Sequence, residues 1–287
     1  MRTYDCRDTL KLMKNIIVQI YEVQTPSEAE SLIEIGVDRI GSIILSEKEW
    51  KVPLIKETVS MTAQTPVMSN LIPLFSNPDS IFRVLDYYRP DVIHFCEALT
   101  NHSGSSESRE GFCPAPELEA LIRLQEDVKK RFPEVRIMRS VPIGEPGMAN
   151  LVPSMEIARM FEPVSDYFLT DTLLAKVPSP SQASASEQQG SSPESQSVDG
   201  FVGITGKTCD WDIAAQLVES SCIPVILAGG ISPDNVSDGI RHVRPAGVDS
   251  CTGTNALDAE GHPIRFKKDL EKVKQLVEKV RNLKLET

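Results

Sequence analysis

The sequence predicts an α/β fold, a single closed (β/α)8 barrel of the TIM type with long insertions after its fourth and sixth strands. Short apolar runs alternate with amphipathic segments of helical period eight times along the 287 residues. The apolar runs show no polar alternation, which is typical of parallel strands covered on both faces by crossover helices. No G-x-G-x-x-G follows the first run, and this disfavours the rival fold, a doubly wound open sheet.

Each unit of the repeat begins with an apolar run and continues with a helical pattern. The expected strands are 15–23, 37–45, 66–74, 90–99, 135–143, 165–174, 223–230 and 246–253. The expected helices are 25–36, 53–63, 78–89, 116–133, 150–163, 210–221, 232–244 and 263–283. Thr25 or Ser27 can cap the first helix, and Gly36 can end it.

We expect one domain, residues 1–287, in which two segments interrupt the alternation of strands and helices. Residues 101–115 follow the fourth strand, and residues 176–200 follow the sixth. The second segment is rich in Ser, Gln, Pro and Glu and offers little to bury, so we expect it to be disordered. Both lie after strands, on the face of a barrel where active sites are built. A lid is one interpretation, and a tolerated surface insertion is the one we favour.

The composition excludes several classes of partner. The formal net charge of −11 leaves no basic surface for nucleic acid or an anionic membrane. The first 15 residues contain no signal-like apolar core, and no stretch approaches the roughly 20 apolar residues of a membrane span. We therefore expect a cytoplasmic protein, a monomer or homodimer, whose partner is a small molecule.

One glycine-bearing stretch lies just before the helix expected at 210–221, and two more lie at the expected ends of strands seven and eight. They read "GITGKTCDW" (203–211), "LAGGISPDNV" (227–236) and "GVDSCTGTN" (247–255). Bare glycines let a ligand approach the main chain, whose N–H groups suit an anion. In barrels, phosphate commonly binds between the loops after strands seven and eight. The stretches therefore predict a phosphorylated ligand.

These three motifs, in this order and followed by "IRFKKDLEKV", resemble phosphoribosylanthranilate isomerase, a barrel of tryptophan biosynthesis that catalyses an Amadori rearrangement. The resemblance is strong from about residue 200 onward and traceable earlier, in "TPSEAESLIEIGVDRIG", "PDVIHFCEA" and "SDYFLTDT". It implies that small residues of the three loops hold the substrate phosphate. They are Gly203, Thr205, Gly206, Gly229, Gly230, Thr252 and Gly253. It also implies that Asp171 is the general acid. We expect no metal and no cofactor.

The general base of the family has no counterpart here. Its cysteine on the first strand aligns with Tyr21, and the glycine that follows aligns with Glu22. A phenol, with an ordinary pKa near 10, is a poorer base at neutral pH than a thiol near 8.5. In the register that the resemblance implies, strand alternation turns Tyr21 and His94 into the barrel, and an imidazole has the better-suited pKa. The candidates for the base are therefore Tyr21, Glu22, His94 and Glu97.

Two further features admit more than one interpretation. Arg139, in the fifth strand, could meet a substrate carboxylate or second phosphate, or it could pair with an internal acid. His94 and Cys96 could begin a metal site, but no H-x-H or C-x-x-C supplies further ligands.

Two functional hypotheses from different classes follow. The first is an aldose–ketose isomerase of a phosphorylated sugar, with a substituted base. The second is a non-catalytic or neofunctionalised barrel that binds a phosphometabolite. An acid, an imidazole and a phosphate site at one barrel mouth exceed what binding requires, which favours the enzyme.

Overall fold

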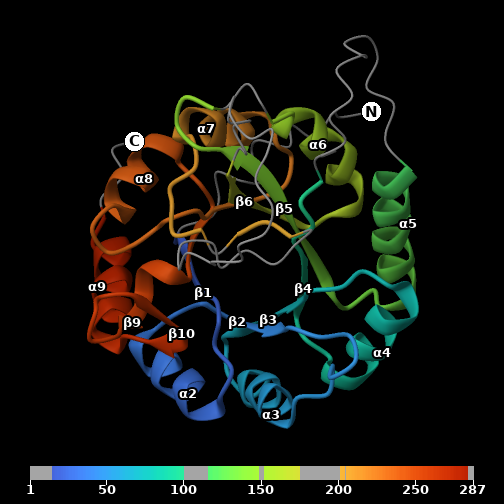
Figure 1. Cartoon of the computed structure of the whole chain (residues 1–287), viewed down its shortest axis with the longest axis horizontal. Coiled ribbons are helices and arrows are strands. Elements are labelled where there is room, and N and C mark those ends of the chain that lie inside the picture. The colour runs from blue at the N-terminus through green and yellow to red at the C-terminus, as the bar shows by residue number, and fades with distance from the viewer. Residues whose placement is uncertain (1–14, 100–115, 149–151, 175–200, 204, 284–287) are drawn as a thin grey trace, which may run out of the picture.

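Eight parallel strands close into a barrel surrounded by helices, as Figure 1 shows. The computed structural model describes residues 15–99, 116–148, 152–174, 201–203 and 205–283, so both expected insertions lie outside the described residues. The strands are β1 (Ile17–Ile20), β2 (Arg39–Ile44), β3 (Met68–Pro73), β4 (Val92–Phe95), β5 (Arg136–Gly144), β6 (Tyr167–Leu173), β7 (Val225–Leu227) and β8 (Gly247–Ser250). Each pairs with its neighbour in sequence, and β8 pairs with β1 to close the barrel. The expected fold class is confirmed.

One helix follows each strand and covers the outside of the barrel (Figure 1). The helices are α2 (Pro26–Ile35), α3 (Pro53–Thr62), α4 (Pro78–Tyr88), α5 (Pro116–Arg131), α6 (Ser154–Phe161), α7 (Trp211–Ser220), α8 (Val236–Val243) and α9 (Leu270–Arg281). Thr25 Oγ1 caps α2 by accepting from the Glu28 amide, and Gly36 ends it in the left-handed conformation at φ 95°. No helix in the described part of the chain is long and apolar enough to span a membrane.

The expected start of the last helix, at Pro263, is wrong. A two-stranded hairpin, β9 (Asn255–Leu257) and β10 (Pro263–Lys268), precedes α9, which begins after the capping carboxylate of Asp269. The Lys268 amide donates to Glu28 of α2, and its ammonium donates to the Cys251 carbonyl. These partners lie far away in the sequence, so a local helical pattern could not reveal them.

Alternation along β5 separates the barrel interior from its outer surface. Met138 and Ser140 face inward, whereas Arg139 registers with Phe95 and Phe168, which pack among the outer apolar clusters. Arg139 is fully buried there. Its guanidinium pairs with Glu97 and donates to Gln125 Oε1 at 2.7 Å. Of the two interpretations of Arg139, the structure therefore supports pairing with an internal acid and contradicts a ligand-binding role.

We expect Glu97→Ala to lower the free energy of unfolding by about 3–5 kcal/mol, because it leaves a buried guanidinium without its counter-charge. Urea unfolding measures the loss. Glu119→Ala, which breaks an exposed pair with Arg123, is the matched control and should cost about 0.5 kcal/mol or less. Equal effects for the two variants would contradict this account of Arg139.

Candidate active site

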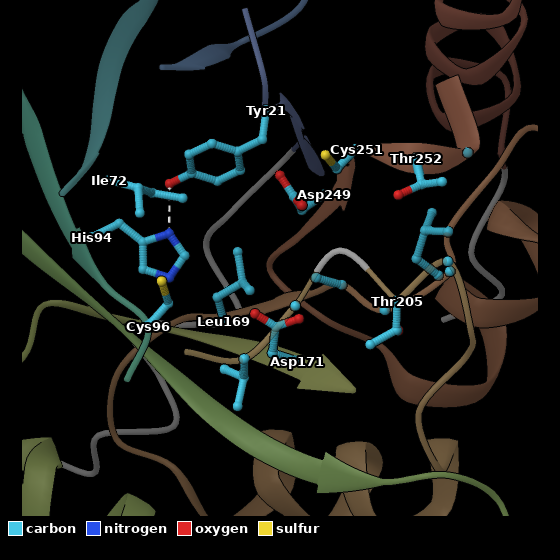
Figure 2. Close-up of a pocket in the computed structure, with 18 of the residues that line it drawn as sticks. Tyr21, Ile72, His94, Cys96, Leu169, Asp171, Thr205, Asp249, Cys251 and Thr252 are labelled. Atoms are coloured by element: carbon cyan, nitrogen blue, oxygen red, sulfur yellow. Dashed lines mark hydrogen bonds between the residues drawn. The ribbon is translucent and has the colours of Figure 1, made fainter. Parts of the chain in front are cut away.

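A pocket of about 690 Å³, open solvent at its mouth included, lies at the carboxyl ends of the barrel strands (Figure 2). Strands β2, β3, β4, β6 and β8 and the segments that follow β1, β3, β4, β6, β7 and β8 contribute residues to its wall. Carboxyl strand ends converge on one face of a closed parallel barrel, so residues remote in sequence meet there.

The three glycine-bearing loops meet along one side of this pocket. All seven residues implied to hold phosphate line it. A β-carbon at Gly253 would lie 2.3 Å from the Ile231 carbonyl oxygen, and one at Gly230 would lie 2.7 Å from the Thr208 amide nitrogen. Gly230 also has φ 61°, where side chains are disfavoured. These glycines therefore let the loops pack backbone against backbone and leave their main chain facing the pocket.

Asp171, near the end of β6, points into the pocket (Figure 2). Its Oδ2 accepts a hydrogen bond from Ser140 Oγ at 3.2 Å. A β-carbon on Gly203 would lie 2.9 Å from the same oxygen, so this glycine packs directly on the carboxylate. Desolvation raises the pKa of Asp171 to about 7. A carboxyl group with this pKa can be protonated at neutral pH and can donate its proton.

A second carboxylate, Asp249 of β8, lines the same pocket, and the sequence analysis missed it. It is 6% exposed and accepts from Gln19 Nε2 at 3.0 Å. Desolvation, together with the charge of Asp171, raises its pKa to about 7. The available signal was a charged residue within an otherwise apolar strand, at the alternation position that also places Cys251 in the pocket.

Tyr21 and His94 face each other inside the barrel. Their contact joins the Tyr21 hydroxyl to His94 Nδ1 at 2.7 Å (Figure 2). Burial, reinforced by the charge of Asp249, raises the pKa of Tyr21 well above its ordinary value. Burial and the charge of Arg139 lower the pKa of His94 to about 3. Both side chains are therefore neutral at pH 7, and neither has a pKa suited to accepting a proton.

Glu22 does not reach the pocket wall. Its side chain is fully buried, with Oε1 paired to Arg265 of β10 at 2.6 Å and Oε2 accepting from Asn255 at 3.3 Å. Its backbone has φ 64°, a conformation that costs energy for a residue with a side chain. The carboxylate thus fastens the end of β1 to the β9–β10 hairpin and is unavailable as a base.

Two thiols, Cys96 and Cys251, complete the reactive groups of the wall. Burial raises the pKa of both, so neither is a thiolate at neutral pH. Within the described ranges, no group of three or more His, Cys, Asp or Glu side chains could hold a metal ion. Apolar side chains from β2, β3 and β6 cover the other part of the wall: Ile43, Ile72 and Leu169.

We expect Asp249→Asn to stabilise the fold at pH 8 by about 2–4 kcal/mol and to have little effect at pH 4. The folded-state pKa near 7 lies above that of an unfolded Asp, so Asp249 favours folding below its unfolded pKa. That contribution is lost as the pH rises through 7. Chemical unfolding at both pH values measures the difference. Asp238→Asn, at an exposed helix position, should show none.

Known proteins resemble this chain in sequence. Residues 175–279 match the family model described as N-(5'phosphoribosyl)anthranilate (PRA) isomerase. An N-(5'-phosphoribosyl)anthranilate isomerase of Methanocella arvoryzae is 28% identical over 92% of this chain and 97% of its own length. One of Methanosarcina mazei is 26% identical over 92% and 94%.

Solved structures share the fold over nearly the whole chain. The phosphoribosyl anthranilate isomerase of Thermotoga maritima superimposes with a TM-score of 0.59, covering 93% of this chain and 100% of its own, at 18% identity. The enzyme of Pyrococcus furiosus gives 0.57 at 17% identity, with coverages of 93% and 100%. The family model and the two relatives show that this chain is similar to phosphoribosylanthranilate isomerases, and the solved structures show that it shares their barrel fold.

Proposed function

We propose that this protein isomerises N-(5'-phosphoribosyl)anthranilate, the reaction named for its relatives. The observation that carries the proposal is a pair of buried carboxyl groups, Asp171 and Asp249, that face one pocket with three glycine-bearing loops. One solved relative is described in complex with reduced 1-(o-carboxyphenylamino)-1-deoxyribulose 5-phosphate, a phosphorylated open-chain sugar. A pocket with a phosphate-binding site and an acid–base pair suits that class of molecule.

The substrate phosphate binds where the three loops meet. No described residue of the pocket wall is Lys or Arg, so the main chain of the glycines and the hydroxyls of Thr205 and Thr252 make the contacts. Hydrogen bonds from main-chain N–H groups are a common mode of phosphate recognition. The dianion adds negative charge beside two carboxyl groups, which favours keeping at least one of them protonated.

The reaction requires a proton on the ring oxygen and the loss of one from C2'. Asp171 donates the first, so that the C1'–O4' bond breaks and leaves an iminium group. An ionised carboxylate then removes the C2' proton to give an enolamine, which tautomerises to the ketose. Asp249 is suited to this second step, because it lines the pocket and has a pKa near neutral pH.

This assignment replaces the base candidates expected from the sequence. A neutral phenol of raised pKa and an imidazole of pKa about 3 are weak bases, and Glu22 is tied to Arg265. Asp249 therefore supplies a base without requiring a tyrosinate or an imidazole of ordinary pKa. A barrel that only binds a phosphometabolite is the alternative, favoured by the tyrosine at the family cysteine position.

We expect Thr252→Asp to weaken binding of inorganic phosphate at least tenfold, because it brings a negative charge to the meeting point of the loops. Isothermal titration of phosphate into both proteins measures the change. Ser60→Asp adds the same charge on an exposed turn of α3 and should leave the affinity unaltered. Undiminished binding by the Thr252 variant would place the phosphate elsewhere.

We expect the unmodified protein to consume phosphoribosylanthranilate, followed as loss of its fluorescence. Asp171→Asn and Asp249→Asn should each lower kcat by about 10²-fold or more, with substrate affinity largely retained. Activity should fall above neutral pH as the acid ionises and below it as the base is protonated, with the two apparent pKa values belonging to the pair.

Asp238→Asn, on the exposed face of α8, is the control for the activity assay. Retained phosphate binding without turnover by the unmodified protein would support the non-catalytic alternative. Full turnover by Asp249→Asn would remove Asp249 from the base role and leave the acid role of Asp171 standing.

A further inference from the structure

A continuous chain of six hydrogen bonds crosses the barrel interior and joins the two carboxylates. It runs from Asp249 through Gln19, Asn70, Tyr21, His94 and Ser140 to Asp171. The five linking side chains come from β1, the segment after β1, β3, β4 and β5, and all are at most 3% exposed. Sequence reasoning identified only Tyr21 and His94 among them, and proposed both as bases.

The Asp249 end fixes the direction of the first links. Gln19 Nε2 donates to the carboxylate at 3.0 Å, so Gln19 Oε1 must face the other way. That oxygen accepts from Asn70 Nδ2 at 2.6 Å. The same Asn70 amide group also donates to the Tyr21 oxygen at 3.4 Å. Because an ionised carboxylate only accepts, the two amide orientations follow from the ionised form of Asp249.

The Asp171 end fixes the remaining links in the same way. Ser140 uses its one proton to donate to Asp171 Oδ2 at 3.2 Å, so it accepts from His94 Nε2 at 2.8 Å. His94 is neutral because burial lowers its pKa to about 3, which leaves Nδ1 as an acceptor for the Tyr21 hydroxyl at 2.7 Å. Every hydrogen bond therefore points from Asn70 toward one of the carboxylates.

We propose that Asn70, Tyr21, His94 and Ser140 are positioning residues that orient Asp171 and stabilise its ionised form through this one-directional chain. Tyr21, at the position of the family base, is then a link in the chain and not a base. The proposal deepens the proposed function, since it rests on Asp171 as the acid, but the chain can be tested without turnover.

The surroundings of Tyr21 show that the barrel is adapted to hold this phenol. A β-carbon on Gly41 of β2 would lie 1.9 Å from Tyr21 Cδ1, so only a glycine leaves room for the ring. Met138 sulfur lies 4.0 Å from the Tyr21 oxygen and closes another side. The ring is thus fixed by packing, and its hydroxyl is held against His94.

The electrostatic surroundings of Asp171 explain why the chain matters. Cys96, after β4, and Cys209, before α7, are neutral thiols of raised pKa, and Asp249 of β8 is a like charge when ionised. His94 is neutral, and Arg139 faces outward to Glu97. No cation among the described pocket-lining residues compensates the carboxylate, so the Ser140 hydrogen bond opposes the desolvation that raises its pKa.

The first measurement is the tautomer of His94, by ¹⁵N NMR of histidine-labelled protein between pH 5 and 9. Four histidines are present in the chain, and the signal lost in His94→Gln identifies the one of interest. We expect a neutral ring that is protonated on Nε2 at pH 8 to 9, where Asp171 is ionised. A ring protonated on Nδ1, or one that becomes charged in this range, would overturn the proposal.

The second measurement is the pKa of Asp171, by ¹³C NMR of its carboxyl group in the full-length protein. We expect Ser140→Ala to raise it by about one pH unit, and Ser140→Thr, which keeps a hydroxyl, to restore it. Tyr21→Phe and Tyr21→Cys should raise it by less and mix the His94 tautomers, because the hydroxyl that donates to His94 Nδ1 is lost.

Ser42→Ala is the matched control, because Ser42 is also a buried strand serine but donates to the Val23 carbonyl at 2.6 Å. Ser42→Ala should leave the pKa of Asp171 unchanged. Ser140→Ala would also leave it unchanged if Ser140 had only a structural role. An unchanged pKa in Ser140→Ala would therefore refute the chain while leaving the proposed reaction standing. Shifted pKa values in a protein without turnover would refute the reaction and leave the chain standing.

Discussion

Water cannot fully solvate a carboxylate inside a closed parallel barrel, and this desolvation governs the arrangement of the candidate site. Asp171 and Asp249 are both held at a pKa of about 7 by their burial. In a more exposed position each would be ionised at neutral pH and could not share acid and base roles. The same burial leaves Tyr21 and His94 neutral, which makes them hydrogen-bonding groups and not proton acceptors.

Buried polar side chains need partners, and the barrel interior supplies them from several different strands. Asn70 donates to Gln19 and Gln19 donates to Asp249, while Ser140 accepts from His94 and donates to Asp171. Closure of the sheet makes this possible, since inward positions of strands distant in sequence face one another across a short span. Arg139 shows the arrangement on the outer side of the barrel. Its side chain points away from the interior, and its buried charge pairs with Glu97.

The departures from the family pattern have local structural compensation. Glu22, which the sequence analysis aligned with a glycine of the resembled family, has a left-handed backbone and forms a buried ion pair with Arg265. Tyr21 is larger than the cysteine it replaces, and Gly41 of the neighbouring strand provides the space. Each substitution is thus matched by a residue on another element.

The sequence by itself determined the barrel, the order of its eight units and the three loops that line one pocket, because apolar periodicity and glycine-bearing strand ends are local signals. It also turned Tyr21 and His94 toward the barrel interior, once the resemblance supplied the register, and the structure shows their contact. Only the tertiary structure decided the orientation of Arg139, the hairpin before α9, the role of Glu22 and the presence of Asp249 in the pocket. The choice of base likewise depended on burial, because a pKa is set by solvation and by neighbours that come from other strands.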